Sequence, residues 1–262
     1  ATFLAGLSEE DYQVAIERLD GRLERLYIPA ETGADADATE LGYRRFRARI
    51  GKRGEIDPGA ARRTWGPVEN EQGYIVQLDF RLLQPGQTII DVSGSYFMSL
   101  DRQREAWELK TALKPLQAAH QLYIERGVRE EGGQMTVTVT PPGGAAKFHQ
   151  PELPEEGYVS QLETLLLPTL LTLRPISAEY GFYAYASQSN TVRFRSADLQ
   201  RIEQGPARWA LVTRKSEDAP PETSLFTEAG EVLRINLPED RIWEPIAPDR
   251  LQALWKQKNL PG

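Results

Sequence analysis

The sequence contains no cysteine and only two histidines. The absence of cysteine excludes disulfide bonds, thiol nucleophiles and cysteine-ligated metal ions. His120 and His149 stand far apart and belong to no HxH or HExxH pattern, so we expect no metal site. The chain also lacks a GxSxG elbow, a phosphate-binding loop and a dinucleotide-binding glycine pattern. We therefore expect no cofactor, and no catalytic motif is recognisable.

Long apolar runs are missing as well. The richest stretch, residues 162–173, is interrupted by Glu163, Pro168 and several threonines. A membrane-spanning helix needs about 20 consecutive apolar residues, so we expect no transmembrane span. The net charge of −7 argues against nucleic acid as a partner, because phosphate groups repel an acidic protein.

The first residue bears on the compartment. The sequence starts at Ala1 rather than Met, as it would after removal of a signal peptide that ends in small residues. We therefore expect an exported protein, periplasmic or extracellular, with a cytoplasmic location as the alternative.

The first local signal is an amphipathic helix over residues 8–28. Ser8 suits the N-cap position and acidic residues follow it, where the helix dipole favours them. The small and acidic residues 30–40 predict a mobile linker. Apolar residues recur at three- and four-residue spacing along the helix, namely Tyr12, Ala15, Ile16, Leu19, Leu23 and Leu26.

From Leu41 onward the apolar period changes to two, which is typical of strands. Short alternating segments separated by Pro and Gly predict a mainly β (α+β) fold: a curved antiparallel sheet or half-barrel of about ten strands packed on a few helices. Two further helices are expected over residues 158–173 and 248–258. One domain over residues 1–262 is the simpler interpretation, and the Pro-rich residues 141–157 are the boundary if the chain is subdivided.

Aromatic residues on both faces of the strand 179–186 suggest a wall that is not open to water. Tyr183 and Tyr185 share one face, and the Leu-rich helix before them would cover it. Ordinary core packing is one interpretation of this pattern. The other is an apolar cavity between sheet and helix that binds a lipid or another apolar small molecule, lined by Tyr183, Tyr185, Leu166 and Leu170.

A row of arginines is the strongest charge feature. Arg45, Arg47 and Arg49 alternate with apolar residues, so a strand would place them on one face, about 6–7 Å apart. Such a row can bind an anion or an acidic protein partner. The alternative explanation is a solvated strand face, or one covered by the acidic N-terminal segment.

The C-terminal hairpin carries a family resemblance. Residues Thr223 to Leu237 read as a strand, an acidic turn with Gly230, and an apolar strand. This order resembles exported proteins with the lipoprotein-carrier (LolA-like) half-barrel. The resemblance implies a single antiparallel sheet bent around helices and able to hold a lipid, and it transfers no functional residue.

Three functions follow from these features. The first is an exported, non-enzymatic protein that binds an apolar or amphiphilic ligand between sheet and helix. The second is an interaction or scaffold protein that uses Arg45, Arg47 and Arg49. The third is a carboxylate-dependent hydrolase, for which clustered acids such as Glu152, Glu155 and Glu156 would have to converge in a cleft.

Overall fold

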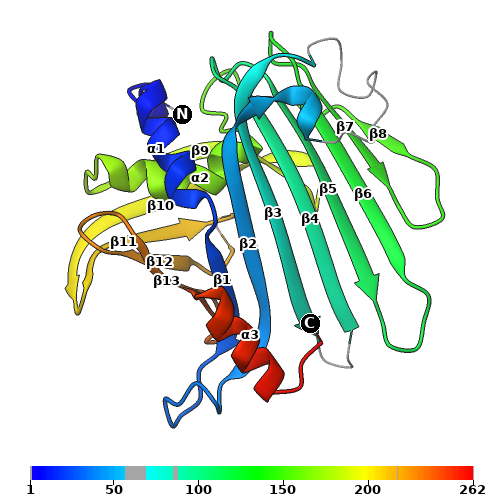
Figure 1. Ribbon diagram of the computed structural model, residues 1–262. Helices are drawn as coiled ribbons and strands as arrows, with labels where there is room; N and C mark the ends of the chain where they lie inside the picture. Colours follow the sequence, from blue (N-terminus) through cyan, green and yellow to red (C-terminus); the bar gives the residue numbers. More distant parts are fainter. Residues whose placement is uncertain (1, 57–68, 85–87, 217, 262) are drawn as a thin grey trace.

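The computed structural model describes residues 2–56, 69–84, 88–216 and 218–261. All of its named strands belong to one antiparallel sheet (Figure 1). The first group runs in chain order: β1 (Leu23–Ile28), β2 (Thr39–Lys52), β3 (Gln72–Gln84), β4 (Thr88–Ser99), β5 (Glu105–Lys114), β6 (Gln121–Arg129), β7 (Met135–Thr140) and β8 (Lys147–His149). The second group is β9 (Ala178–Ala186), β10 (Thr191–Gln204), β11 (Ala207–Arg214), β12 (Glu222–Phe226), β13 (Val232–Asn236) and β14 (Ile242–Pro245).

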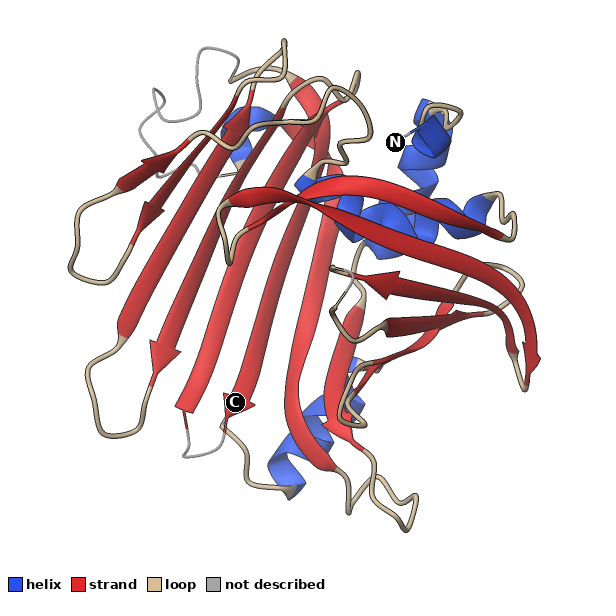
Figure 2. Cartoon of the chain, turned by 180° about the vertical axis from the view of Figure 1, so that it is seen from behind, coloured by secondary structure: helices blue, strands red, loops and turns tan. Residues whose placement is uncertain are grey.

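The two groups meet through the last strand. β14 pairs with β13 on one side and with β1 on the other, where Trp243 lies opposite Leu26. The sheet order is therefore β8 to β1 followed by β14 to β9, with β8 and β9 at opposite edges. The strands β9 to β12 cross the direction of β2 to β6, so the sheet is strongly curved (Figure 2).

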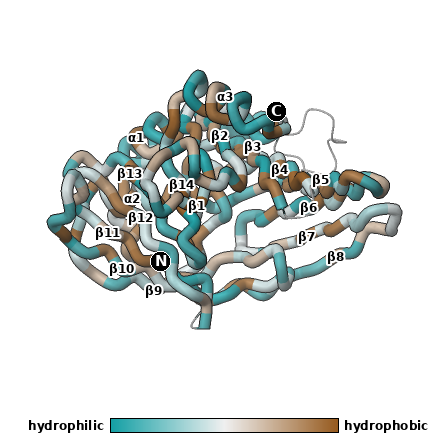
Figure 3. The backbone as a smooth tube through the Cα atoms, turned by 90° about the horizontal axis from the view of Figure 1, so that it is seen from below, coloured by the Kyte–Doolittle hydropathy of each residue, from teal (hydrophilic) through white to brown (hydrophobic). Residues whose placement is uncertain are grey.

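Within the described residues, three α-helices accompany the sheet: α1 (Glu9–Leu19), α2 (Gln161–Leu173) and α3 (Pro248–Gln257). Short 3₁₀ segments occur at Thr2–Leu4 and Arg53–Glu55. α1 and α2 pack together and against the inner, concave face, and Figure 3 shows the strands β9 to β13 bending around α2. α3 lies on the outer face, where Trp255 packs edge-on against Tyr43 of β2. Over the described residues, no helix is long and apolar enough to cross a membrane.

The main core fills the space between the inner face and the two inner helices. Tyr12 of α1 stacks on Tyr74 of β3, and Leu162 and Leu166 of α2 are fully buried. The alternation in the sequence determines which face of β2 is buried. Phe46 and Ala48 point into the core, while Arg45 and Arg47 are exposed. The prediction of a mainly β fold with a curved antiparallel sheet is confirmed.

The predicted helix over residues 8–28 was wrong in its second half. α1 ends at Leu19, because Gly21 adopts a left-handed φ of 73° and Asp20 turns its carboxylate to the backbone N–H of Ala48. Residues 23–28 then form β1. Leu23 and Leu26 continue the helical spacing by coincidence.

The expected strand number was also too low, since the described chain forms fourteen strands rather than about ten. β8 and β14 are three and four residues long, too short to show alternation. β1 lies within the segment that was predicted as a helix.

Two predicted segments have defined surroundings. The linker 30–40 ends at Thr39, where β2 begins, and Asp35 pairs with Arg25 of β1 and Arg250 of α3. Its mobility stays a prediction. Residues 141–157 follow β7, contain the short edge strand β8 and lead towards α2, and the strands on both sides of them form one sheet.

Candidate ligand-binding site

A cavity of about 380 Å³ lies between α2 and the inner face of the sheet; we call it the inner cavity. α2 forms one wall with Thr164, Leu165, Leu167 and Pro168. The opposite wall comes from β2 and from strands β9 to β14. Its volume is within the range of small-molecule sites, about 300–1,000 Å³.

The apolar part of the inner cavity follows from strand alternation and curvature. Phe182 of β9, Ile235 of β13 and Trp243 of β14 each point to the inner face, and Ile235 lies directly opposite Trp243. Leu165 and Leu167 face them from α2. Because the sheet bends around α2, side chains from distant strands enclose one apolar space.

Two arginines at the β1–β2 end give the inner cavity a positive charge. Arg22 Nε lies 3.1 Å from the carboxylate of Glu24, which also pairs with Arg44. The Glu24 side chain is fully buried, so a single carboxylate serves two guanidinium groups. Both arginines lie over the ring of Phe46, at 4.8 and 5.3 Å from its centre. Burial lowers the pKa of Arg22, and the charge of Arg44 acts in the same direction.

Arg195 of β10 is the second source of positive charge. It points inward opposite Phe182 and donates from Nη2 to the carbonyl of Tyr185 at 2.9 Å. Its Nε is buried without a hydrogen-bond partner, and no carboxylate of the described residues forms an ion pair with it. Burial lowers the pKa of this guanidinium, while Tyr158 and Glu222 oppose the shift.

A second, more polar cavity of about 520 Å³ adjoins the first; we call it the polar cavity. The two cavities share Arg195 and Lys215. Lys215 pairs with Glu222 at 2.5 Å. The polar cavity is lined further by Gln161, Tyr185, Ala186, Ser187, Gln188, Ser189, Arg193, Ser216 and Ala219. Arg195 therefore stands at the boundary between an apolar space and a polar one.

No family model matches this sequence, and no curated protein matches it. The solved structures that are similar in fold include a beta-barrel-like protein of the domain of unknown function DUF1849 from Brucella abortus. The TM-score is 0.50 at 12% sequence identity, over 87% of this chain and 96% of that one. The fold is barrel-like. At this identity the likeness shows architecture alone.

Within the barrel-like fold, the predicted ligand residues fall in different places. Tyr185 is buried, packs against Trp107 and lines the polar cavity. Tyr183 is 37% exposed and packs edge-on against Phe194, away from both cavities. Leu166 and Leu170 are buried in the core beside the inner cavity and line neither cavity. Their binding role stays a prediction.

The inner cavity is lined by Leu165 and Leu167, within the Leu165–Leu171 surface that the sequence suggested, and by Arg195, which the sequence analysis did not single out. The two leucines lie in the same Leu-rich helix as Leu166, but the direction of each side chain depends on how α2 lies in the sheet. Arg195 shares its strand face with Ala197 and Leu199, which are fully buried. The sequence signal for Arg195 was its alternation with Ala197 and Leu199, which places a cation on the same strand face as apolar residues.

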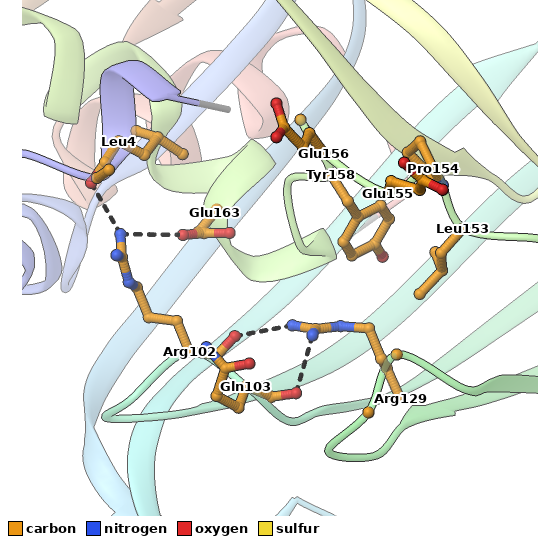
Figure 4. A pocket seen from close by; sticks show the side chains of 14 residues that line it. Leu4, Arg102, Gln103, Arg129, Leu153, Pro154, Glu155, Glu156, Tyr158 and Glu163 are labelled. Atoms are coloured by element: carbon orange, nitrogen blue, oxygen red, sulfur yellow. Dashed lines mark hydrogen bonds and ion pairs between the residues drawn. The ribbon is translucent and has the colours of Figure 1, made fainter.

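A different pocket, of about 560 Å³, lies at the N-terminal end of α2 (Figure 4). Arg102 donates to the carbonyl of Leu4 and to the hydroxyl of Tyr12, which in turn donates to Glu163 at 2.7 Å. Burial and the Glu163 charge raise the pKa of Tyr12 far above its ordinary range. These groups hold one another and fix α1 to α2.

The same pocket contains a second group of bonded charges. Arg129 donates to Glu105 at 3.0 Å, and Tyr158 donates to the same carboxylate at 2.6 Å. The other oxygen of Glu105 accepts the backbone N–H of Gln161 at 2.9 Å. Glu105 and Glu163 thus both cap the start of α2. The hydrogen bonds of these two carboxylates account for their burial, so a catalytic role is not needed to explain it.

The arginine row is exposed on the outer face, as the alternation predicts. Arg47 pairs with Asp79 at 2.8 Å and Arg49 with Glu55 at 2.8 Å. Arg45 lines a groove of about 660 Å³ beside α3. Two of the three charges are therefore neutralised within the chain, and the partner-binding role stays a prediction.

Proposed function

We propose that this protein binds an amphiphilic small molecule in the inner cavity and does not catalyse a reaction on it. The observation that carries the proposal is the composition of the lining of the inner cavity. Leu165, Leu167 and Trp243 offer apolar surface, and Arg195 adds a charge at the border with the polar cavity. A molecule with an apolar chain and a polar end matches both parts.

The resemblance of the C-terminal hairpin to the lipoprotein-carrier (LolA-like) half-barrel supports the same proposal. In that family a bent antiparallel sheet encloses helices and can hold a lipid. Export to the periplasm or the extracellular space is part of the proposal. Fractionation of cells that produce the tagged product of the complete gene tests it, and recovery only from the cytosol would contradict export.

The binding proposal is tested with a fluorescent single-chain amphiphile and the purified protein. Leu165 is half-buried and lines the inner cavity, so Leu165→Glu places a charge against the apolar chain. Affinity should fall about tenfold or more, because a charge in an apolar site is costly. Leu116→Glu is the matched control, since Leu116 is 67% exposed and lies outside both cavities.

Two results would overturn the proposal. One is that the wild-type protein binds no amphiphile of any head group. The other is that Leu165→Glu, folded by circular dichroism, binds as well as Leu116→Glu. Native mass spectrometry of the purified protein provides an independent measurement, since a co-purifying amphiphile adds its mass to the chain.

A further inference from the structure

The positive charge around the inner cavity exceeds the negative charge. Five cationic side chains of the described residues line it, against one carboxylate, Glu222. Glu222 already pairs with Lys215, and Glu24 is shared between Arg22 and Arg44. The chain as a whole carries a net charge of −7, so this excess is local to the cavity.

Arg195 differs from the other cations in its surroundings. Arg22, Arg44 and Lys215 each have a carboxylate partner, and Arg214 is exposed, whereas the half-buried Arg195 has only the carbonyl of Tyr185 among the described residues. A partly buried guanidinium without an ion-pair partner is costly, because it loses hydration that no paired anion replaces. Its Nε is one of the buried polar atoms that lack a hydrogen-bond partner.

The position of Arg195 suits a head group rather than a free ion. It lies opposite Phe182, which lines the apolar inner cavity, and it also lines the polar cavity together with Lys215. An anion bound here would have an apolar space on one side and serine and glutamine side chains on the other. A molecule with an anionic end and an apolar chain would occupy both.

We propose that Arg195 binds the oxyanion head group, carboxylate or phosphate, of an amphiphile whose apolar chain lies in the inner cavity. This inference rests on the proposed function and specifies the class of its ligand. The planar guanidinium donates from Nε and Nη to two oxygens of the head group. Lys215, which is exposed and paired with Glu222, lies at the same border between the two cavities.

The experiment compares ligands that share a chain and differ in the head group. Dodecanoate, dodecyl phosphate, dodecanol and dodecyltrimethylammonium are titrated into the wild-type protein by calorimetry. The two anionic ligands should bind about tenfold to a hundredfold more tightly than dodecanol, as expected for charge-assisted hydrogen bonds. Acetate and inorganic phosphate, which lack the chain, should bind far more weakly than their dodecyl counterparts.

The variant Arg195→Gln should remove this preference. Its affinity for dodecanoate should fall to that for dodecanol, and its affinity for dodecanol should not change. Arg201→Gln is the matched control, because Arg201 lies on the same strand, is largely exposed, pairs with Glu228 and lines neither cavity. Like Arg195→Gln, this variant removes one positive charge from β10, but it changes no residue that lines either cavity.

Several results would overturn the inference while leaving amphiphile binding intact. The first is that the wild type binds dodecanoate and dodecanol equally tightly. The second is that Arg195→Gln still prefers dodecanoate to dodecanol as strongly as the wild type does. The third is that Arg195→Gln loses affinity for both ligands equally. Binding of inorganic phosphate as tight as dodecyl phosphate would also refute it. If no dodecyl ligand binds, the proposed function fails as well. Should Arg195→Gln not fold, the wild-type comparison of the four head groups decides.

Discussion

Glu125 of β6 holds together two parts of the sheet that are far apart in its order. Its carboxylate is buried and accepts hydrogen bonds from Trp107 Nε1 at 2.8 Å, the Tyr185 hydroxyl at 3.2 Å and Ser187 Oγ at 3.0 Å. Trp107 belongs to β5, whereas Tyr185 belongs to β9 at the far edge. The substitution Glu125→Ala therefore tests how strongly this contact stabilises the curved sheet.

The magnitude follows from the donors that the substitution leaves behind. Trp107 Nε1 loses its acceptor in the core, which costs about 1–3 kcal/mol. Tyr185 keeps a bond to Asn190 at 3.1 Å, and Ser187 is exposed to water, so they add little. Removing a buried carboxylate also relieves a desolvation cost. We expect a net loss of about 1–3 kcal/mol in the free energy of unfolding.

Urea unfolding, followed by tryptophan fluorescence and circular dichroism, measures this change. Glu152→Ala is the control, because Glu152 is exposed, and it should stay within about 0.5 kcal/mol of wild type. Tyr185→Phe should cost less in the Glu125→Ala background than in the wild type, since the acceptor is already gone. A loss for Glu125→Ala no larger than for Glu152→Ala would refute the reasoning.

Three further predictions concern stability. Ser160→Ala should cost about 1 kcal/mol in chemical unfolding, because Ser160 and Glu163 cap the start of α2 reciprocally. Gly127→Ala should cost about 1–3 kcal/mol, since a Cβ at this position would lie within 2.2 Å of the Trp107 ring. Stability should also fall above about pH 10 in urea unfolding measured across pH. Burial and carboxylate neighbours raise the pKa of Tyr12 and Tyr158, so the folded state keeps protons that the unfolded state releases.

Each of these has an outcome that would contradict it. Ser160→Ala should be compared with Ser160→Thr, which keeps the cap, and equal stability of the two would argue against capping. An unchanged unfolding midpoint in Gly127→Ala would mean that the Trp107 ring can move. For the tyrosines, Tyr12→Phe should weaken the alkaline loss, and an identical pH profile would exclude Tyr12 as a source.

The sequence predicted most of the sheet because its alternation is locally visible. The segment from Tyr74 to Leu82 lies within β3, and the alternation of Phe46 and Ala48 with Arg45 and Arg47 gave the correct inner face of β2. The end of α1 was missed because the helical spacing of apolar residues continues past Gly21. The glycine, which adopts a left-handed φ, was the stronger signal. β14 was missed because four residues ending in a proline show no period.

The site was predicted only at the level of the elements that form it. A cavity between the Leu-rich helix and the sheet was one of two interpretations of the sequence, and Leu165 and Leu167 line it rather than Leu166 and Leu170. Arg44 and Arg195 are far apart in the sequence. They line the same cavity only because the sheet curves, and no local pattern encodes that curvature.

The place of β14 in the sheet has a consequence for synthesis on the ribosome. Every other strand precedes β14 in the chain, yet β14 fills the position between β1 and β13. Until residues 242–245 have left the ribosome, β1 and β13 each present an unpaired edge, and such edges favour aggregation. Pairings such as Glu24 with Pro245 join residues at opposite ends of the sequence and form slowly. The nascent chain therefore needs protection at two strand edges until its last strand is inserted.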